Sequence, residues 1–254
     1  MEIGRIMYIG DMIISYDISR ARINMVITFE LKNTFSHIDE EGQAYIIGDL
    51  LRGENIKREM KRYGEKWIYT TNLPDGRYRY KFLVDDIIRI NDSEASCYEI
   101  DEYGEVWSVI IVKEDRKMSL RSEKIYFDNL TIVENKNSIS QVGRIPYISA
   151  LRTLYVHAIV SINGGFGLHN VTILWIEPTG TIFQTDEIGL SIDDIPYPVS
   201  KIETDLNIKN TLKFYPSGKW YVHIYLDGEF GGAGEFYLDM GYGYTSTVID
   251  CLIG

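Results

Sequence analysis

The chain of 254 residues is poor in cysteine, proline and histidine, with two Cys, six Pro and four His. Cys97 and Cys251 lie far apart and form no Cys-x-x-Cys pair, which excludes a zinc ribbon and a disulfide framework. Two reduced thiols are the simpler expectation, although one long-range bridge stays open. The histidines form neither a His-x-His nor a His-Glu-x-x-His pattern. We therefore expect no metal ion and no cofactor.

Basic residues and long apolar runs are also scarce. Asp and Glu outnumber Lys and Arg by 37 to 26, which gives a net charge of −11. Phosphate backbones and anionic membrane surfaces attract basic proteins, so we expect no nucleic-acid partner and no membrane partner. No run approaches the roughly 18 apolar residues of a membrane span. Glu2, Arg5 and Asp11 interrupt the first apolar run, unlike in a signal peptide, so we expect a cytoplasmic location.

Strand signals dominate the sequence. Aromatic residues make up 13% of the chain, and 19 of them are Tyr. Apart from Leu83, apolar and charged side chains alternate along residues 77–85, and this period of two sends one set to the core and the other to water. The alternation predicts that Lys81 faces solvent. Leu73–Gly76 has the composition of a tight turn, and Asp227-Gly228 between two apolar runs predicts a β-hairpin.

These signals predict an all-β fold of two tandem immunoglobulin-like antiparallel β-sandwiches. A densely charged segment between Val112 and Lys124 separates an expected domain at 1–117 from one at 118–254. Only Leu51–Tyr63 has the pattern of a short helix or a long loop. We interpret the basic side chains within Arg52–Lys66 as a solvated loop face.

A short internal repeat supports two domains of similar plan. Gly4–Ile9 and Gly143–Ile148 both read Gly-Arg-Ile-x-Tyr-Ile, and a long apolar run follows each copy. Coincidence is the alternative, and we favour two domains that open with the same strand. The glycine-rich stretch 163–169 predicts a flexible tip between strands, and 231–234 is a second glycine-rich segment. No helix signal follows either one, so neither is a phosphate loop. The strands expected in the second half are 154–162, 171–176, 206–214, 220–226 and 233–238.

Four segments of the first half carry a family resemblance. They are Ala44–Asp49, the single Trp67, Leu73–Asp85 with its Pro-Asp-Gly-x-Tyr-x-Tyr-Lys-Phe run, and Tyr103–Ile110. Together they resemble the glycogen-binding modules found at the N-terminus of isoamylases and on the β subunit of AMP-activated kinase. The resemblance covers about residues 22–113. It implies an early-set immunoglobulin-like sandwich, with Trp67 in its core.

The resemblance also implies a carbohydrate-binding site at Lys81, Tyr103 and Trp107. Glucan-binding members use two Trp platforms and a Lys, and Lys81 matches that Lys. Neither platform is present, because the segments after Asp49 and Asp86 contain no aromatic residue. Trp107 and Tyr103 instead stand on the closing strand and rebuild a surface for the apolar face of a sugar. The alternative is that Trp107 packs in the core or beneath the second domain.

We therefore expect a non-catalytic protein that binds a polysaccharide or oligosaccharide such as α-glucan or glycogen. The alternative is a protein–protein interaction or assembly module that has lost glycan binding and that recruits a protein partner or forms a homo-oligomer. We expect no enzyme, because the sequence has no Gly-x-Ser-x-Gly elbow and two sandwiches leave no room for a catalytic barrel. An exposed Trp107 favours glycan binding, and a buried one favours the assembly module.

Overall fold

The protein is built from β-strands. A computed structural model describes residues 25–32, 42–51, 57–114, 116–120, 123–135, 145–192, 200–208 and 215–241, and the backbone alone of 6–9 and 12–15. Within these ranges the only helical turn is the 3-10 turn η2 (Asp49–Leu51), so the all-β prediction is confirmed. No helix in them is long and apolar enough to cross a membrane.

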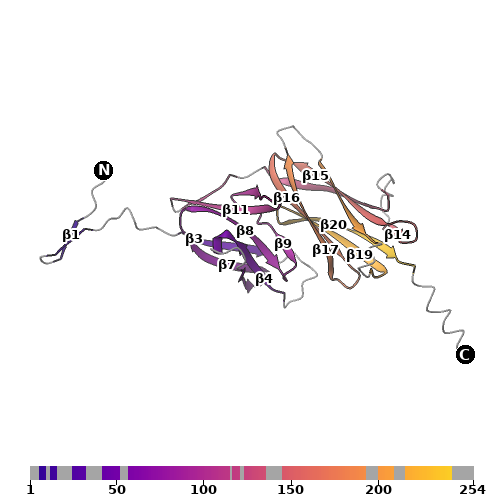
Figure 1. The fold of residues 1–254 in the computed structure, drawn as a ribbon, viewed down its shortest axis with the longest axis horizontal. Helices are drawn as coiled ribbons and strands as arrows, with labels where there is room; N and C mark the ends of the chain where they lie inside the picture. Colours follow the sequence, from indigo (N-terminus) through magenta and orange to yellow (C-terminus); the bar gives the residue numbers. More distant parts are fainter. Residues whose placement is uncertain are drawn as a thin grey trace, which may run out of the picture.

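Two antiparallel sheets form the first half of the chain, on the left of the folded body in Figure 1. The smaller sheet has the order β3-β7-β6, and the larger has the order β10-β11-β8-β4-β5, with β9 beside β8 and β12 beside β11. The strands are β3 (Met25–Lys32), β4 (Ala44–Gly48), β5 (Lys57–Glu59), β6 (Lys61–Tyr63), β7 (Lys66–Leu73), β8 (Gly76–Val84), β9 (Ile88–Ile90), β10 (Cys97–Ile100), β11 (Val106–Lys113) and β12 (Arg116–Met118).

Two further sheets form the second half, with the orders β13-β15-β18 and β14-β20-β19-β16-β17. The pairing is antiparallel except between β14 and β20, which run parallel. The strands are β13 (Ile125–Val133), β14 (Tyr147–Ser149), β15 (Tyr155–Gly164), β16 (Gly167–Ile176), β17 (Ile182–Ile192), β18 (Ser200–Asn207), β19 (Gly218–Leu226) and β20 (Glu229–Asp239). A separate two-stranded sheet pairs β1 (Ile6–Ile9) with β2 (Met12–Ser15).

Each half has its own hydrophobic cluster. Trp67 is buried in the first, as predicted, and Trp175 and Trp220 are buried in the second. Strand β16 is buried on both faces, since Ile173 and Trp175 belong to the second cluster whereas Leu174 and Ile176 belong to the first. The uninterrupted apolar run 173–176 therefore reflects a strand between two packed surfaces rather than one wet face.

The β19–β20 hairpin joins the halves at its turn. Asp227 and Gly228 have φ values of 51° and 85°, the positive values that a two-residue type I′ turn requires at both positions. The predicted Asp-Gly hairpin is thus confirmed. A Cβ at Gly228 would lie 1.9 Å from the carbonyl oxygen of Asn91 in the first half. Only glycine permits this close approach.

The prediction of a helix or a long loop over Leu51–Tyr63 is wrong where the structure describes the segment. Strands β5 and β6 occupy it, one at the edge of each sheet of the first half. Met60 lies between them and is buried, so it anchors the corner where the chain passes from one sheet to the other. The side chains of both short strands are exposed, which agrees with a solvated basic face. Residues 52–56 lie outside the described ranges.

Other local predictions also need correction. The strand expected at 206–214 is β18, which ends at Asn207, and residues 209–214 are not described. The glycine-rich stretch 163–169 does hold a tip between strands, but a shorter one than expected, because only two residues separate β15 from β16, which belong to different sheets. The repeated segments are not equivalent: β1 pairs with β2, whereas β14 pairs with β20. The Gly-Arg that opens each copy lies outside the described residues.

Candidate functional site

Lys81 and Trp107 lie side by side on one face of the larger sheet of the first half. Strands β8 and β11 are antiparallel, with Tyr80 opposite Ser108, so the next residues on each strand are neighbours on the other face. The Lys81 ammonium lies 5.4 Å from the centroid of the Trp107 ring. The alternation of the sequence thus correctly places an ammonium beside an indole.

The predicted exposure of Lys81 is wrong. The residue is 0% exposed, and its Nζ contacts Glu105 Oε1 at 2.8 Å and Glu187 Oε2 at 2.5 Å. Glu187 belongs to β17 of the second half, and this strand covers the face that alternation assigns to water. The close approach of β17 is also seen at Gly189, where a Cβ would lie 2.8 Å from Val106. Because the ammonium is buried between two carboxylates, a ligand cannot reach Lys81.

Trp107 is half-buried, and a carboxylate fixes its ring. The indole Nε1 donates to Asp101 Oδ2 at 2.9 Å, and the other carboxylate oxygen accepts the backbone amides of Tyr103 and Glu105, each at 2.9 Å. Burial acts to raise the pKa of Asp101, but these hydrogen bonds, with the charge of Arg79, lower it below its usual value. Asp101 is therefore a charged support that orients the indole.

Tyr103 presents its side chain to solvent. It lies at the tip of the turn between β10 and β11 and is 85% exposed. Of the three predicted site residues, Tyr103 is therefore open, Trp107 is half-open and Lys81 is closed. The structure brings all three to one end of the β8–β11 pair, and the rings of Tyr103 and Trp107 keep surface that is open to solvent.

Charged residues surround the indole. The Arg79 guanidinium lies 6.0 Å from the Trp107 centroid, and its Nε donates to Asp49 Oδ2 at 2.8 Å. This hydrogen bond raises the pKa of Arg79. Glu105 accepts from Arg89 as well as from Lys81. The alternation along β8 predicts that Arg79 lies on the same face as Lys81. No local pattern in the sequence predicts that Glu187 of β17 contacts Lys81.

The expected Trp platforms are absent, as the sequence indicates. Leu50 in η2 is buried, and Ile87 in the turn after β8 is exposed. Asp85 and Asp86 have φ values of 49° and 59°, so they form this turn rather than continue the strand. Within the described ranges, no group of three or more His, Cys, Asp or Glu side chains is arranged to hold a metal ion.

Comparison with known families places the candidate site inside a recognised module. Residues 39–119 match the model of the family described as the glycogen recognition site of AMP-activated protein kinase. The predicted resemblance is thereby confirmed over less than half of the chain, and the match supports a carbohydrate-binding-like role. No curated protein matches the sequence.

Similarity to solved structures is weak. The β-glucosidase of Listeria innocua, determined in complex with glucose, is 12% identical with a TM-score of 0.30, over 50% of this chain and 17% of that one. The maltogenic amylase of S. marinus is 10% identical with a TM-score of 0.28, over 85% of this chain and 28% of that one. The alkylpurine DNA glycosylase of Pseudomonas fluorescens is 16% identical with a TM-score of 0.29, over 45% and 30%. The chain spans less than a third of each of these proteins, and scores this low carry no argument.

Proposed function

We propose that this protein binds a glycan without transforming it, and that its ligand is an α-glucan such as glycogen. The observation that supports this most strongly is the family match over residues 39–119, because the segment contains Lys81, Tyr103 and Trp107. The proposal includes a cytoplasmic location. It also includes two immunoglobulin-like sandwiches in tandem, at 1–117 and 118–254, which the two hydrophobic clusters support.

In this proposal Trp107 and Tyr103 contact the glycan. A pyranose ring has an apolar C–H face that stacks on a flat aromatic side chain, while nearby polar groups fix its orientation. The Trp107 indole is held by Asp101, so little conformational entropy is lost when a sugar binds to it. Lys81 is a positioning residue, because its ammonium holds Glu105 beside the indole and ties β8 to β17.

Affinity electrophoresis tests the proposal. Native gels that contain glycogen or amylopectin should retard the full chain, and gels with a β-glucan should retard it less. Trp107→Ala should abolish the retardation. The matched control is Tyr63→Ala, which removes another exposed aromatic ring from the edge strand β6 of the other sheet. Unretarded migration of the wild-type protein in all three gels overturns the proposal.

An assembly module is the second candidate, and the burial of Lys81 favours it. The family's Lys is engaged by the protein's own carboxylates, and exposed Ile87 stands in the segment expected to supply a platform. Such a surface suits a protein partner or a second copy of the chain. Size-exclusion chromatography with light scattering tests self-association, and a pull-down tests for other partners. A monomer that captures no partner contradicts this candidate.

A further inference from the structure

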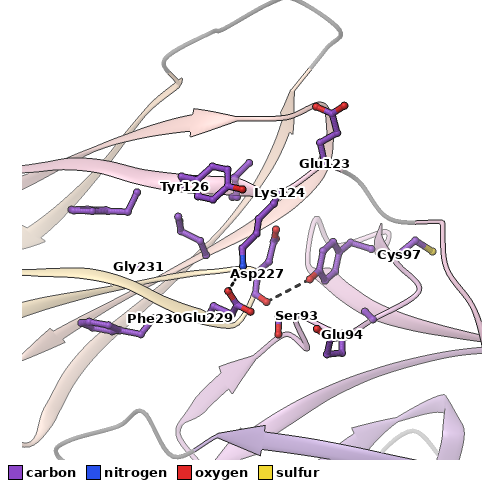
Figure 2. Close-up of a pocket in the computed structure, with 15 residues that line it drawn as sticks. Ser93, Glu94, Cys97, Glu123, Lys124, Tyr126, Asp227, Glu229, Phe230 and Gly231 are labelled. Atoms are coloured by element: carbon purple, nitrogen blue, oxygen red, sulfur yellow. Dashed lines mark hydrogen bonds and ion pairs between the residues drawn. The ribbon is translucent and has the colours of Figure 1, made fainter.

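A cavity of about 390 Å³ lies where the two halves meet, toward the lower end of the size range of small-ligand pockets. Three segments form its walls: residues 93–98 of the first half, 123–127 at the start of β13, and 226–231 around the β19–β20 turn. Figure 2 shows Lys124 reaching from the β13 side to Glu229. Tyr98 also lines the cavity, and its hydroxyl lies 3.5 Å from the carbonyl oxygen of Asp227. Neither Trp107 nor Tyr103 lines this cavity.

The polar groups of the cavity form a mixed set of donors and acceptors. Lys124 Nζ donates to Glu229 Oε2 at 2.7 Å, and Tyr98 Oη donates to the carbonyl oxygens of Asp92 and Asp227 at 2.9 and 3.5 Å. The hydrogen bond from Lys124 is the main reason why the pKa of Glu229 lies below its usual value, so the carboxylate is charged. A sugar hydroxyl both donates and accepts, and an ammonium paired with a carboxylate offers it both partners at one point.

Aromatic surface lies beside these groups. Tyr126 is 59% exposed and Phe230 is 45% exposed, and both line the cavity. The Phe127 ring lies against the backbone of β20, since a Cβ at Gly232 would be 2.7 Å from Phe127 Cε1. The glycine-rich stretch 231–234 thus has a packing role and brings β20 close to β13. Exposed rings next to polar groups suit the apolar face and the hydroxyls of a pyranose.

The hairpin wall of the cavity is held in place before any ligand arrives. Asp227 Oδ2 lies 2.8 Å from Nδ1 of the buried His169, and Asp227 Oδ1 accepts the amide of Asn170 at 2.8 Å. On the other side, Gly228 is locked against Asn91. A wall fixed by both halves loses little entropy on binding, which favours affinity for a small ligand.

From this geometry we infer that the junction cavity is a second saccharide site, which takes a neutral mono- or oligosaccharide. The inference rests on the proposed function, because it assigns the same class of ligand to a different place. The carboxylates that line the cavity also suit a cation, but a cation must approach the Lys124 ammonium that stands among them. A neutral polyol avoids this repulsion and gains hydrogen bonds from both members of the pair.

Isothermal titration calorimetry of the full chain with maltose and maltotriose tests the inference. Glu229→Gln removes a charged acceptor, and Tyr126→Ala removes an exposed ring. Each should weaken maltotriose binding at the cavity about tenfold and leave binding at Trp107 unchanged, since tenfold is the loss expected for one charge-assisted hydrogen bond or one stacking contact. The first matched control is Glu235→Gln: Glu235 lies on β20 like Glu229, and it forms an ion pair with Lys219 of β19. The second is Tyr63→Ala, which removes an exposed ring elsewhere. Both should leave the affinity unchanged.

The outcomes separate this inference from the proposed function. If glycogen gels retard the protein and Trp107→Ala abolishes both retardation and maltotriose binding, while both cavity variants bind maltotriose normally, the cavity site is overturned and the proposed function stands. If neither glycogen nor the short saccharides bind, both fail. If spermidine binds and Glu229→Gln removes that binding while maltotriose gives no heat, the cavity is a cation site and the inference is wrong. Thermal unfolding of each variant shows that it remains folded.

Discussion

Replacing Lys81 by methionine removes a buried cation from between two carboxylates of different halves. Methionine has a similar length and keeps most of the apolar contacts of the lysine stem. Breaking a buried ion pair from one side costs about 3–5 kcal/mol, because the remaining charge stays buried and unpaired. Glu105 and Glu187 are 24% and 22% exposed at their side chains, and Glu105 keeps Arg89, so some of the lost interaction is replaced. We therefore expect a loss of about 3 kcal/mol in the free energy of unfolding.

Urea unfolding at neutral pH measures this loss. About 3 kcal/mol is a large part of the roughly 5–15 kcal/mol that holds a typical domain together, so the midpoint should fall clearly. Adding Glu187→Gln to Lys81→Met removes one of the stranded charges and should restore about 1–2 kcal/mol. The control is Lys66→Met, which breaks the exposed ion pair with Glu30 and should cost less than about 1 kcal/mol.

The result that refutes this reasoning is equally clear. If Lys81→Met and Lys66→Met cost the same small amount, the Lys81 ammonium is hydrated in solution and β17 does not cover it. Lys81 would then be available to a ligand, as the alternation along β8 predicts.

Three further predictions concern the junction, the core and the Trp107 support. Gly228→Ala should destabilise the protein by more than Gly180→Ala, because both glycines have positive φ but only Gly228 lies against the backbone of the other half. Urea unfolding of the two variants measures the difference, and equal losses in the free energy of unfolding would contradict the close contact. Tyr80→Phe should lower the free energy of unfolding by about 1–3 kcal/mol, since it removes the hydroxyl that donates to the buried Asp92 Oδ2 at 2.6 Å. A loss near zero would mean that water replaces the hydroxyl. The folded-state pKa of Asp101 lies below its unfolded value of 3.8, so its stabilising contribution is present above pH 3.8 and is lost as the pH falls through the folded value. The acid transition of Trp107 fluorescence should therefore disappear in Asp101→Asn. An unchanged transition would mean that Asp101 does not hold the indole.

Local signals in the sequence predict the strands and turns well. The Asp227-Gly228 turn is readable because its positive φ values suit very few residue pairs. The Leu73–Gly76 turn is found at the predicted place, between β7 and β8. Gly76 does not have a positive φ, and a Cβ there would lie 2.8 Å from the hydroxyl of Tyr78, so a larger residue would displace the end of that side chain. The helix or loop expected at Leu51–Tyr63 fails because a buried Met60 turns the chain between two sheet edges.

The contacts between the halves are what the sequence alone does not reveal. Alternation correctly places Lys81 and Trp107 on one face, but it carries no information about Glu187, which reaches Lys81 from a distant strand. The run 173–176 is apolar throughout and so indicates burial on both faces, yet it does not say which surface covers each face. The junction cavity draws on three distant segments, and no local pattern marks such a site.

The central claim is that a glucan lies on Trp107, and the fluorescence of this residue tests it directly. Trp67, Trp175 and Trp220 are fully buried, so acrylamide reaches mainly the Trp107 indole. Saturating maltoheptaose should protect the quenchable fraction of the emission, and Trp107→Phe should lose both the quenching and the protection. Acrylamide quenching that is identical with and without maltoheptaose would contradict the account.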